Sequence, residues 1–371
     1  VYALERMVTV MVITCPHALG LAVPLVVAVS TSLAAGRALL IRNRAAFEQA
    51  RNLSVVVFDK TGTLTEGRFG VQQVIDLADQ GEDELLRLAA AIESRSEHPI
   101  AQGITAAAQE RDLEIPTPEE FEAIAGKGAR GEVENRTILV VSPGYLKEND
   151  IQVEQREALA EAADQGQTLV YVLEEEKPLG AVALADIIRE ESREAVKRLK
   201  AQGLEVMMLT GDSEPVAAWV AQELGLNDYF AEVLPDEKAD KIKAVRERKG
   251  ITAMVGDGIN DAPALAEADV GIAIGAGTDV AIESADIVLV KSDPRDVVAI
   301  IQIAQETYRK MVQNLWWATG YNALAIPLAA GVLFPIGFIL PPAAGAVVMS
   351  LSTIIVAVNA KLLGRRIESS E

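Results

Sequence analysis

Cysteine and histidine are scarce in this chain. Its 371 residues include one cysteine, Cys15, and only two histidines. An intrachain disulfide is therefore excluded, and the sequence gives no disulfide evidence for an oxidising compartment. Cys15 must be a free thiol, a ligand or an inert residue.

Positive charge is also in short supply. The 34 lysines and arginines face 54 acidic residues, which gives a net charge of -20. This balance argues against nucleic acid as a partner, because phosphate contacts need clustered Lys and Arg. Hydrophobic residues make up 50% of the chain and the mean hydropathy is +0.21, which is high for a soluble protein. We expect an acidic, solvated headpiece attached to a part that lies in lipid.

The start of the chain lacks the features of a signal peptide. Val1 opens an apolar run without a charged n-region or a small-residue cleavage site. We interpret the sequence as a fragment of a longer protein.

Three stretches are apolar and long enough to cross a bilayer, which needs about 20 helical residues. Arginines and lysines follow the first, precede the second and end the third, so the positive-inside rule places the central region and the C-terminus in the cytoplasm. The predicted spans are Met7 to Ala35, Met311 to Phe334, and Ile336 to Leu363, within membrane regions 1–36 and 306–363, followed by a cytoplasmic tail, 364–371.

The soluble middle alternates apolar strand-like runs with helical patterns, which predicts an α/β sheet. The segment 67–184 interrupts this alternation and predicts an inserted domain within a sheet domain formed by 37–66 and 185–305. The strand-like runs are Leu53 to Phe58, Glu205 to Leu209, Thr252 to Val255 and Ile287 to Val290, and the helical patterns are Arg189 to Gln202 and Val216 to Leu224.

A carboxylate stands directly after the first buried strand. Asp59 opens the sequence Asp-Lys-Thr-Gly-Thr, so it lies at a strand end on a Gly-containing loop, where ligands of α/β sheets bind. An aspartate can attack a γ-phosphoryl group only if nearby cations offset the charges. The other strand ends supply suitable groups. The segment Thr210-Gly211-Asp212 offers a hydroxyl and a flexible backbone amide for phosphate oxygens. Lys238 can offset charge, and the carboxylates of Asp257 and Asp261 are hard oxygen ligands suited to Mg²⁺.

The ordered motifs DKTGT, TGD, LPDEK and GDGIND resemble the signature set of the P-type ATPases. The resemblance covers nearly the whole chain. It implies a haloacid-dehalogenase-like Rossmannoid phosphorylation domain, an inserted α+β nucleotide-binding domain and transmembrane helices. It implies ATP and Mg²⁺ as cofactors. The implied roles are Asp59 as nucleophile and Mg²⁺ ligand, Asp257 as Mg²⁺ ligand, Thr61 as backbone Mg²⁺ ligand and phosphate contact, Thr210, Lys238 and Asn260 as phosphate contacts, and Asp261 as support.

Thr61 separates this chain from phosphatases of the same fold. Such phosphatases usually have an aspartate two positions after the nucleophile, where it serves as general acid and base. Threonine cannot do this near neutral pH. We therefore expect an aspartyl phosphate that persists.

The inserted segment contains Ser96-Glu97-His98-Pro99 and Gly126-Lys127-Gly128. Each alone is a weak signal, because a histidine before proline is usually a helix-end residue and paired glycines usually form a turn. Together with Glu93 they look like the adenine pocket of heavy-metal P-type ATPases. By that resemblance Glu93, His98, Gly126 and Gly128 bind ATP. The sequence contains no GxxxxGK[ST] motif, so the P-loop alternative is excluded.

The first apolar span contains Thr14-Cys15-Pro16-His17. Proline should break the helix at bilayer depth and free carbonyl groups. A thiolate with an imidazole suits copper or another soft-to-borderline metal, and polar groups in a membrane indicate function. A kinked helix with a buried cysteine is the alternative.

The later spans add further candidate ligands for the transported ion. With Cys15 and His17 they resemble the copper-transporting subclass that has CPH, and the histidine leaves Cu²⁺ and Ag⁺ open beside Cu⁺. The candidates are Asn314, Tyr321, Asn322, Met349, Ser350, Ser352 and Thr353.

The family also has an actuator domain with a TGE loop, and no TGE occurs in this sequence. We expect the fragment to need that missing domain and further membrane helices, besides membrane lipid and a metal ion, for a transport cycle. We predict an ATP-driven copper exporter. The alternatives are a Zn²⁺, Cd²⁺ or Ag⁺ pump, a membrane-tethered phosphatase, and a non-catalytic metal-binding regulator.

Overall fold

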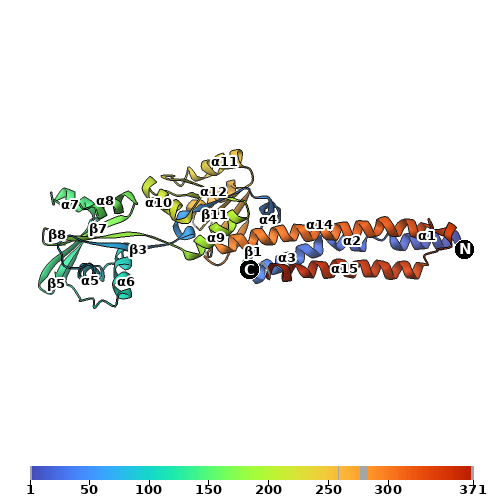
Figure 1. The fold of residues 1–371 in the computed structure, drawn as a ribbon, viewed down its shortest axis with the longest axis horizontal. Helices are drawn as coiled ribbons and strands as arrows, with labels where there is room; N and C mark the ends of the chain where they lie inside the picture. The colour runs from blue at the N-terminus through green and yellow to red at the C-terminus, as the bar shows by residue number, and fades with distance from the viewer. Residues whose placement is uncertain (1, 258, 276–282, 369–371) are drawn as a thin grey trace.

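The computed structural model describes residues 2–257, 259–275 and 283–368. Figure 1 shows an elongated arrangement of two sheet domains followed by a bundle of long helices. A seven-stranded sheet lies in the middle, a six-stranded sheet lies at the far end from the bundle, and the N-terminus lies at the opposite tip.

The seven-stranded sheet is parallel except for its first pair, β1 and β13. Its central strand β2 is buried along its whole length, as the run of valines predicts. All four predicted strands are confirmed, whereas the Gly- and Ala-containing strand β12 was not predicted. In spatial order the strands are β1 (Leu39–Ile41), β13 (Ile287–Leu289), β12 (Val270–Ile274), β11 (Thr252–Gly256), β2 (Val55–Asp59), β9 (Glu205–Leu209) and β10 (Asp228–Phe230).

Successive side chains of β2 point to opposite faces of this sheet. Val56 and Phe58 pack in one hydrophobic core, whereas Val55 and Val57 pack in another on the opposite face. The first core includes residues of α9 and α10, and the second includes residues of α11 and α12. The helices around the sheet are α4 (Arg44–Gln49), α9 (Glu190–Ala201), α10 (Glu214–Leu224), α11 (Lys238–Lys249) and α12 (Ala262–Glu267).

The six-stranded sheet is antiparallel and is inserted between β2 and α9. The chain enters it along β3 and leaves along β8, so two long paired strands connect the two sheets (Figure 1). Helices α5 and α6 cover one face, and α7 and α8 the other. The elements are β3 (Thr65–Asp76), α5 (Glu82–Glu93), α6 (Pro99–Glu110), β4 (Glu119–Ile124), β5 (Gly128–Val133), β6 (Arg136–Val141), α7 (Pro143–Glu148), α8 (Glu157–Asp164), β7 (Thr168–Glu174) and β8 (Lys177–Ile188).

The helical bundle contains both ends of the described chain. Its helices are α1 (Tyr2–Ile13), α2 (His17–Ala22), α3 (Pro24–Gly36), α14 (Arg295–Ala330) and α15 (Pro342–Glu368). By length and composition, two stretches in the described part of the chain could cross a membrane, Ala3–Gly36 and Pro342–Gly364. The predicted span from Met311 to Phe334 is not one of them, because amides such as Gln313 and Asn322 lower its hydropathy.

The bounds of the soluble domains and of the tail stay predictions. Helix α14 runs without interruption through the predicted boundary at residue 306. Residues 364–368 of the predicted tail continue α15, and residues 369–371 lie outside the described part of the structure.

Candidate functional site

The proposed nucleophile lies at the carboxyl end of β2. Asp59 is the last residue of this strand and is 6% exposed. The loop that follows turns at Gly62, whose φ of 75° falls in the left-handed region. A Cβ at Gly62 would lie 1.9 Å from Asp257 Oδ2, so a glycine is required here for two reasons. The loop therefore brings its backbone against the carboxylate that follows β11.

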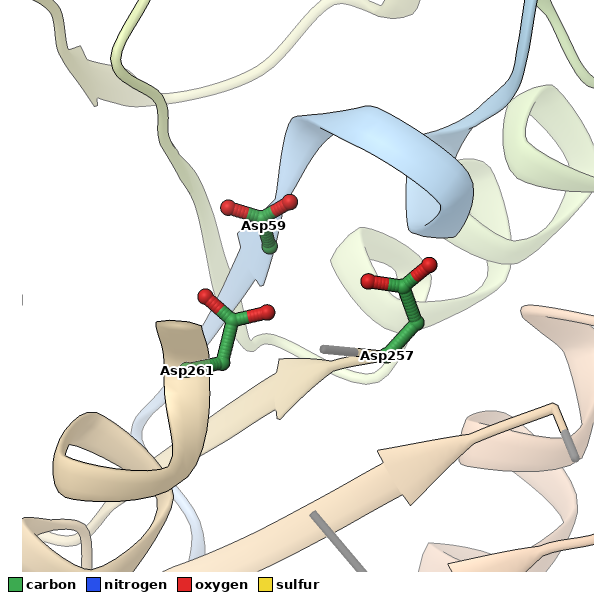
Figure 2. Close-up of side chains that lie close together, drawn as sticks. All are labelled: Asp59, Asp257 and Asp261. Carbon is green, nitrogen blue, oxygen red and sulfur yellow. The ribbon is translucent and has the colours of Figure 1, made fainter. Parts of the chain in front are cut away.

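Three carboxylates meet beside one lysine at this edge of the sheet. Asp59, Asp257 and Asp261 each offer an oxygen within 4.8 Å of the others. Figure 2 shows the three side chains close together at the ends of their elements. The Lys238 ammonium donates to Asp59 Oδ1 at 2.6 Å and to Asp261 Oδ1 at 2.7 Å. The structure thus brings together Asp59, Lys238, Asp257 and Asp261, which come from three separate motifs of the set.

The electrostatics of the cluster favour an added cation. The pKa of Asp59 is raised to about 7, chiefly by burial and next by the Asp261 carboxylate, while Lys238 lowers it. Burial, followed by Asp261, also raises the pKa of Asp257. Burial lowers the pKa of Lys238, but the two paired carboxylates outweigh this and raise it. The three acids and one base of this cluster leave an excess of negative charge when all are ionised.

This donor set fits Mg²⁺. The ion takes oxygen ligands at about 2.0–2.1 Å, so two oxygens of one shell lie roughly 3–4 Å apart. The observed limit of 4.8 Å is slightly wider than such a shell. Lys238 is paired with both Asp59 and Asp261, so the assignment of the ion to Asp59 and Asp257 rests on the resemblance.

The neighbouring strand β9 brings the TGD residues to the same edge. Asp59 pairs in register with Leu209, so Thr210 follows next to the nucleophile. The Thr210 hydroxyl donates to Asp212 Oδ2 at 3.0 Å, and Gly211 lies between them. Asn260 is exposed on the turn before Asp261, and Thr61 lies in the loop two residues after Asp59.

A second ionic cluster beside the nucleophile was not predicted. Lys60 is buried, and its ammonium contacts Asp186 at 3.0 Å and Asp212 at 2.9 Å. Arg189 donates to the backbone oxygens of Thr65 at 3.0 Å and of Gly62 at 3.4 Å. Lys60 stands within the first motif, so its position was a usable signal. Asp186 and Arg189 are brought in by β8 and gave no local pattern.

The second sheet contains a cavity of about 640 Å³ that all four predicted nucleotide residues line. Burial raises the pKa of Glu93 to about 7, opposed by a hydrogen bond from Ser96. His98 caps α6, and its Nδ1 accepts from the Ile100 amide at 3.3 Å. A Cβ at Gly128 would lie 2.0 Å from the Val140 carbonyl oxygen, so this wall of the cavity requires glycine. Gly126, with a φ of 69°, turns the chain at the rim.

The cavity and the acidic cluster lie on different sheets. Figure 1 shows that β5, which begins at Gly128, lies far from β11 along the molecule. The paired strands β3 and β8 connect the two regions.

The helix breaks where the sequence predicts. Helix α1 ends at Ile13 and α2 begins at His17, on either side of Pro16. Cys15 Sγ and His17 Nδ1 lie 2.8 Å apart in this break. The thiol and the imidazole are thus close enough to share one ion.

The other candidate ligands in the bundle fall into four groups. The hydroxyls of Tyr321 and Ser352 are buried and find no hydrogen-bond partner among the residues that the structure describes. Ser350 and Thr353 donate to carbonyls of their own helix, at 3.0 Å and 3.2 Å. Asn314 is bonded to neighbouring helices. Met349 and Asn322 are half-buried.

The chain matches the model of the haloacid dehalogenase-like hydrolases over residues 53–269 and belongs to this family. It is 63% identical over 362 residues to the copper-exporting P-type ATPase B of Archaeoglobus fulgidus, covering 98% of this chain and 52% of that protein. The copper-exporting P-type ATPase B of Enterococcus hirae is 47% identical over 363 residues, with 97% and 48% covered.

The fold of the chain is similar to that of a solved structure. The crystal structure of a zinc-transporting PIB-type ATPase in its E2.Pi state has a TM-score of 0.81 and 35% sequence identity, and covers 95% of this chain and 56% of that chain. The predicted resemblance to the copper type of the heavy-metal-transporting P-type ATPases is confirmed by these relatives. The chain spans about half the length of the curated relatives it matches.

Proposed function

We propose that this chain forms the phosphorylation, nucleotide-binding and ion-binding parts of an ATP-driven pump that exports copper ions. The observation that carries the proposal is the meeting of Asp59, Lys238, Asp257 and Asp261 at the carboxyl edge of the parallel sheet. A buried aspartate that shares a lysine with a second acid is suited to accept a phosphoryl group.

The phosphoryl transfer uses an oxygen of Asp59. An Asp59 carboxylate oxygen forms the new bond to the γ-phosphorus, and the bond from that phosphorus to the bridging β–γ oxygen breaks, so ADP leaves with the electron pair. Lys238 offsets the charge of the reacting oxygens. Mg²⁺, when bound by Asp59, Asp257 and the Thr61 backbone, would supply further neutralisation of the phosphate charge.

The phosphorylated Asp59 should persist after ADP leaves. Thr61 occupies the position where a phosphatase has its general acid and base, and a threonine hydroxyl does not ionise near neutral pH. The energy of the acyl phosphate is then available for movement of the domains. This argument favours a pump over a membrane-tethered phosphatase.

One nucleotide contacts two parts of the chain. The adenine occupies the cavity between Glu93, His98 and Gly128, and the γ-phosphate reaches Asp59 when the two sheets approach. Bending at the strands β3 and β8 permits this approach. Lys60, Asp186 and Arg189 connect the nucleophile loop to the end of β8 and keep the loop aligned during the movement.

The cargo is a soft or borderline metal ion held by Cys15 and His17. A thiolate and an imidazole 2.8 Å apart favour copper over hard cations. The copper-exporting relatives support copper, and the zinc-transporting structure keeps zinc as the alternative.

The test is acid-stable labelling of the full-length parent from γ-labelled ATP across Cu⁺, Cu²⁺, Ag⁺, Zn²⁺ and Cd²⁺. We expect copper to stimulate the label, Cys15→Ala to abolish the stimulation, and Asp59→Asn to abolish the label. Stimulation by zinc or cadmium alone would establish the alternative cargo. A label without any dependence on metal or on Cys15 would contradict the transport proposal.

A further inference from the structure

A buried polar network joins three segments of the helical bundle. Asn314 on α14 is 1% exposed, and Lys310, one turn earlier, is 6% exposed. The Lys310 ammonium donates to Asn359 Oδ1 at 2.9 Å, and Asn359 Nδ2 donates to Asn314 Oδ1 at 2.8 Å. Asn359 lies on α15 and therefore connects the two residues of α14 through its single amide.

The Asn314 amide nitrogen is directed at backbone carbonyls of the neighbouring helices. Asn314 Nδ2 donates to the carbonyl oxygen of Ala22 at 3.2 Å and to that of Val356 at 3.4 Å. Ala22 is the last residue of α2, the short helix that begins at His17. The network therefore holds the far end of the segment that carries His17 against α14 and α15.

A small apolar core lies at the same position in the bundle. Ala18 and Ala22 of α2 form one small core with Ala318 of α14 and Val356 of α15. The two carbonyl acceptors of Asn314 belong to residues of this core. Packing alone lets smooth helices slide, whereas directional hydrogen bonds fix their register. Asn314 is thus placed to fix the position of α2.

Helix α14 connects this network directly to the phosphorylation sheet. It is continuous from Arg295 to Ala330, and Val297 and Ile301 in its first part pack in the same core as Phe58, next to the nucleophile. Met311, three residues before Asn314, still belongs to that core. A tilt of α14 relative to α15 would therefore strain the bonds that hold α2.

We infer that Asn359 and Lys310 are positioning residues for the transported-ion site, and that Asn314 clamps α2 in place instead of ligating the ion. The inference rests on the proposed function, since it concerns the ion held by Cys15 and His17. The side-chain oxygen of Asn314 accepts from Asn359 and its nitrogen donates to two carbonyls. In this arrangement Asn314 has its polar atoms occupied without a metal ion.

The test measures Cu⁺ affinity and stoichiometry in the full-length parent, purified in detergent, by competition with a chromogenic chelator. Asn359→Asp keeps an acceptor for Lys310 but cannot donate to Asn314. Asn314→Asp keeps an acceptor for Asn359 but cannot donate to the two carbonyls. Gln313→Ala is the matched control, because this exposed amide is 3.5 Å from Asn359 Nδ2 and neighbours Asn314 in sequence.

We expect both Asp variants to weaken Cu⁺ binding by about tenfold with unchanged stoichiometry, because each loses buried hydrogen bonds that hold α2 in place. The control should bind as the parent does. Asn359→Leu should give the same result as Asn359→Asp, and nucleotide binding to each variant verifies folding.

Two results would overturn the inference. The first is unchanged Cu⁺ affinity in both Asp variants. The second is loss of bound Cu⁺ in the Asn314 variant alone, which would make Asn314 a ligand. Cu⁺ binding is measured without ATP, so this test does not depend on phosphorylation. If the parent bound Cu⁺ but formed no label on Asp59, the proposed pump would be refuted, and the Cu⁺ affinities of the variants would still test this inference.

Discussion

The raised pKa of Asp59 makes the metal-free protein less stable at neutral pH than it would be with an uncharged residue there. An unfolded aspartate ionises above about pH 4, whereas the folded carboxyl ionises only above about pH 7. Between these values the unfolded state binds fewer protons, so stability falls as the pH rises. Replacing Asp59 by asparagine removes the ionisation and with it this loss.

The size of the effect follows from the pKa. A rise from 3.8 to about 7 corresponds to about 4 kcal/mol at pH 8 and to about 2 kcal/mol at pH 5. For a domain of this size, 1 kcal/mol moves Tm by roughly 2–4 °C. We expect Asp59→Asn to raise the Tm of the detergent-solubilised chain in EDTA by roughly 10 °C at pH 8 and roughly 4 °C at pH 5.

Asp79→Asn is the matched control. This carboxylate is exposed and has a φ of 54°, which asparagine tolerates. It should change Tm little at either pH. Added Mg²⁺ should stabilise the parent at pH 8 more than the Asp59→Asn variant, because the variant lacks one carboxylate ligand. An equal or lower Tm for Asp59→Asn at pH 8, or a gain that does not depend on pH, would refute the electrostatic reasoning.

Three further predictions concern the lysine and the cavity. Lys238→Met should slow phosphorylation in the full-length parent by about 10²-fold, since two carboxylates then face each other without a cation; an unchanged rate measured by rapid quench would contradict this. Nucleotide affinity, measured by calorimetry, should fall from pH 6 to pH 8 in the parent but not in Glu93→Gln, because Glu93 loses its proton near pH 7. An affinity that rises with pH in the parent would show instead that the ionised carboxylate of Glu93 is the form that binds nucleotide. Gly128→Ala should destabilise the nucleotide domain by about 1–3 kcal/mol in thermal unfolding, because the added Cβ would clash with the Val140 carbonyl. A Cβ added at Gly126 has no atom within 4 Å, so Gly126→Ala should cost about 1 kcal/mol or less.

The sequence was sufficient for the phosphorylation sheet because its signals are local. A run of valines followed at once by Asp59 fixes both a buried strand and the place of its carboxyl end. Motifs at the ends of parallel strands then meet at one edge, whatever their separation in the chain. Strand β12 was not predicted because its one glycine and one alanine lower the apolar signal, although the strand is fully buried.

The contacts of Lys60 and Asn314 could not be predicted in the same way. Lys60 meets Asp186, which lies 126 positions later and arrives only through the return strand of the inserted domain. The sequence pattern placed Asn314 among the candidate ligands, but such a pattern cannot tell an amide that faces an ion from one that bonds to a neighbouring backbone. The partners of Asn314 are set by how α2, α14 and α15 pack.

The continuity of α14 also could not be predicted from the sequence pattern. Composition changes near residue 306, where the helix leaves the soluble core and enters the bundle, and this change predicts a domain boundary. The backbone, however, has no reason to break there, because the helix contains no proline or glycine between Arg295 and Ala318. The surroundings change while the helix continues.

The central claim is that Asp59 carries the phosphoryl group. The most direct measurement is peptide mapping of the acid-quenched full-length parent after brief reaction with γ-labelled ATP and copper. We predict that the label lies on the peptide containing Val55–Leu64, and that it disappears in Asp59→Asn. A label on another peptide, or one that survives in Asp59→Asn, would contradict the account.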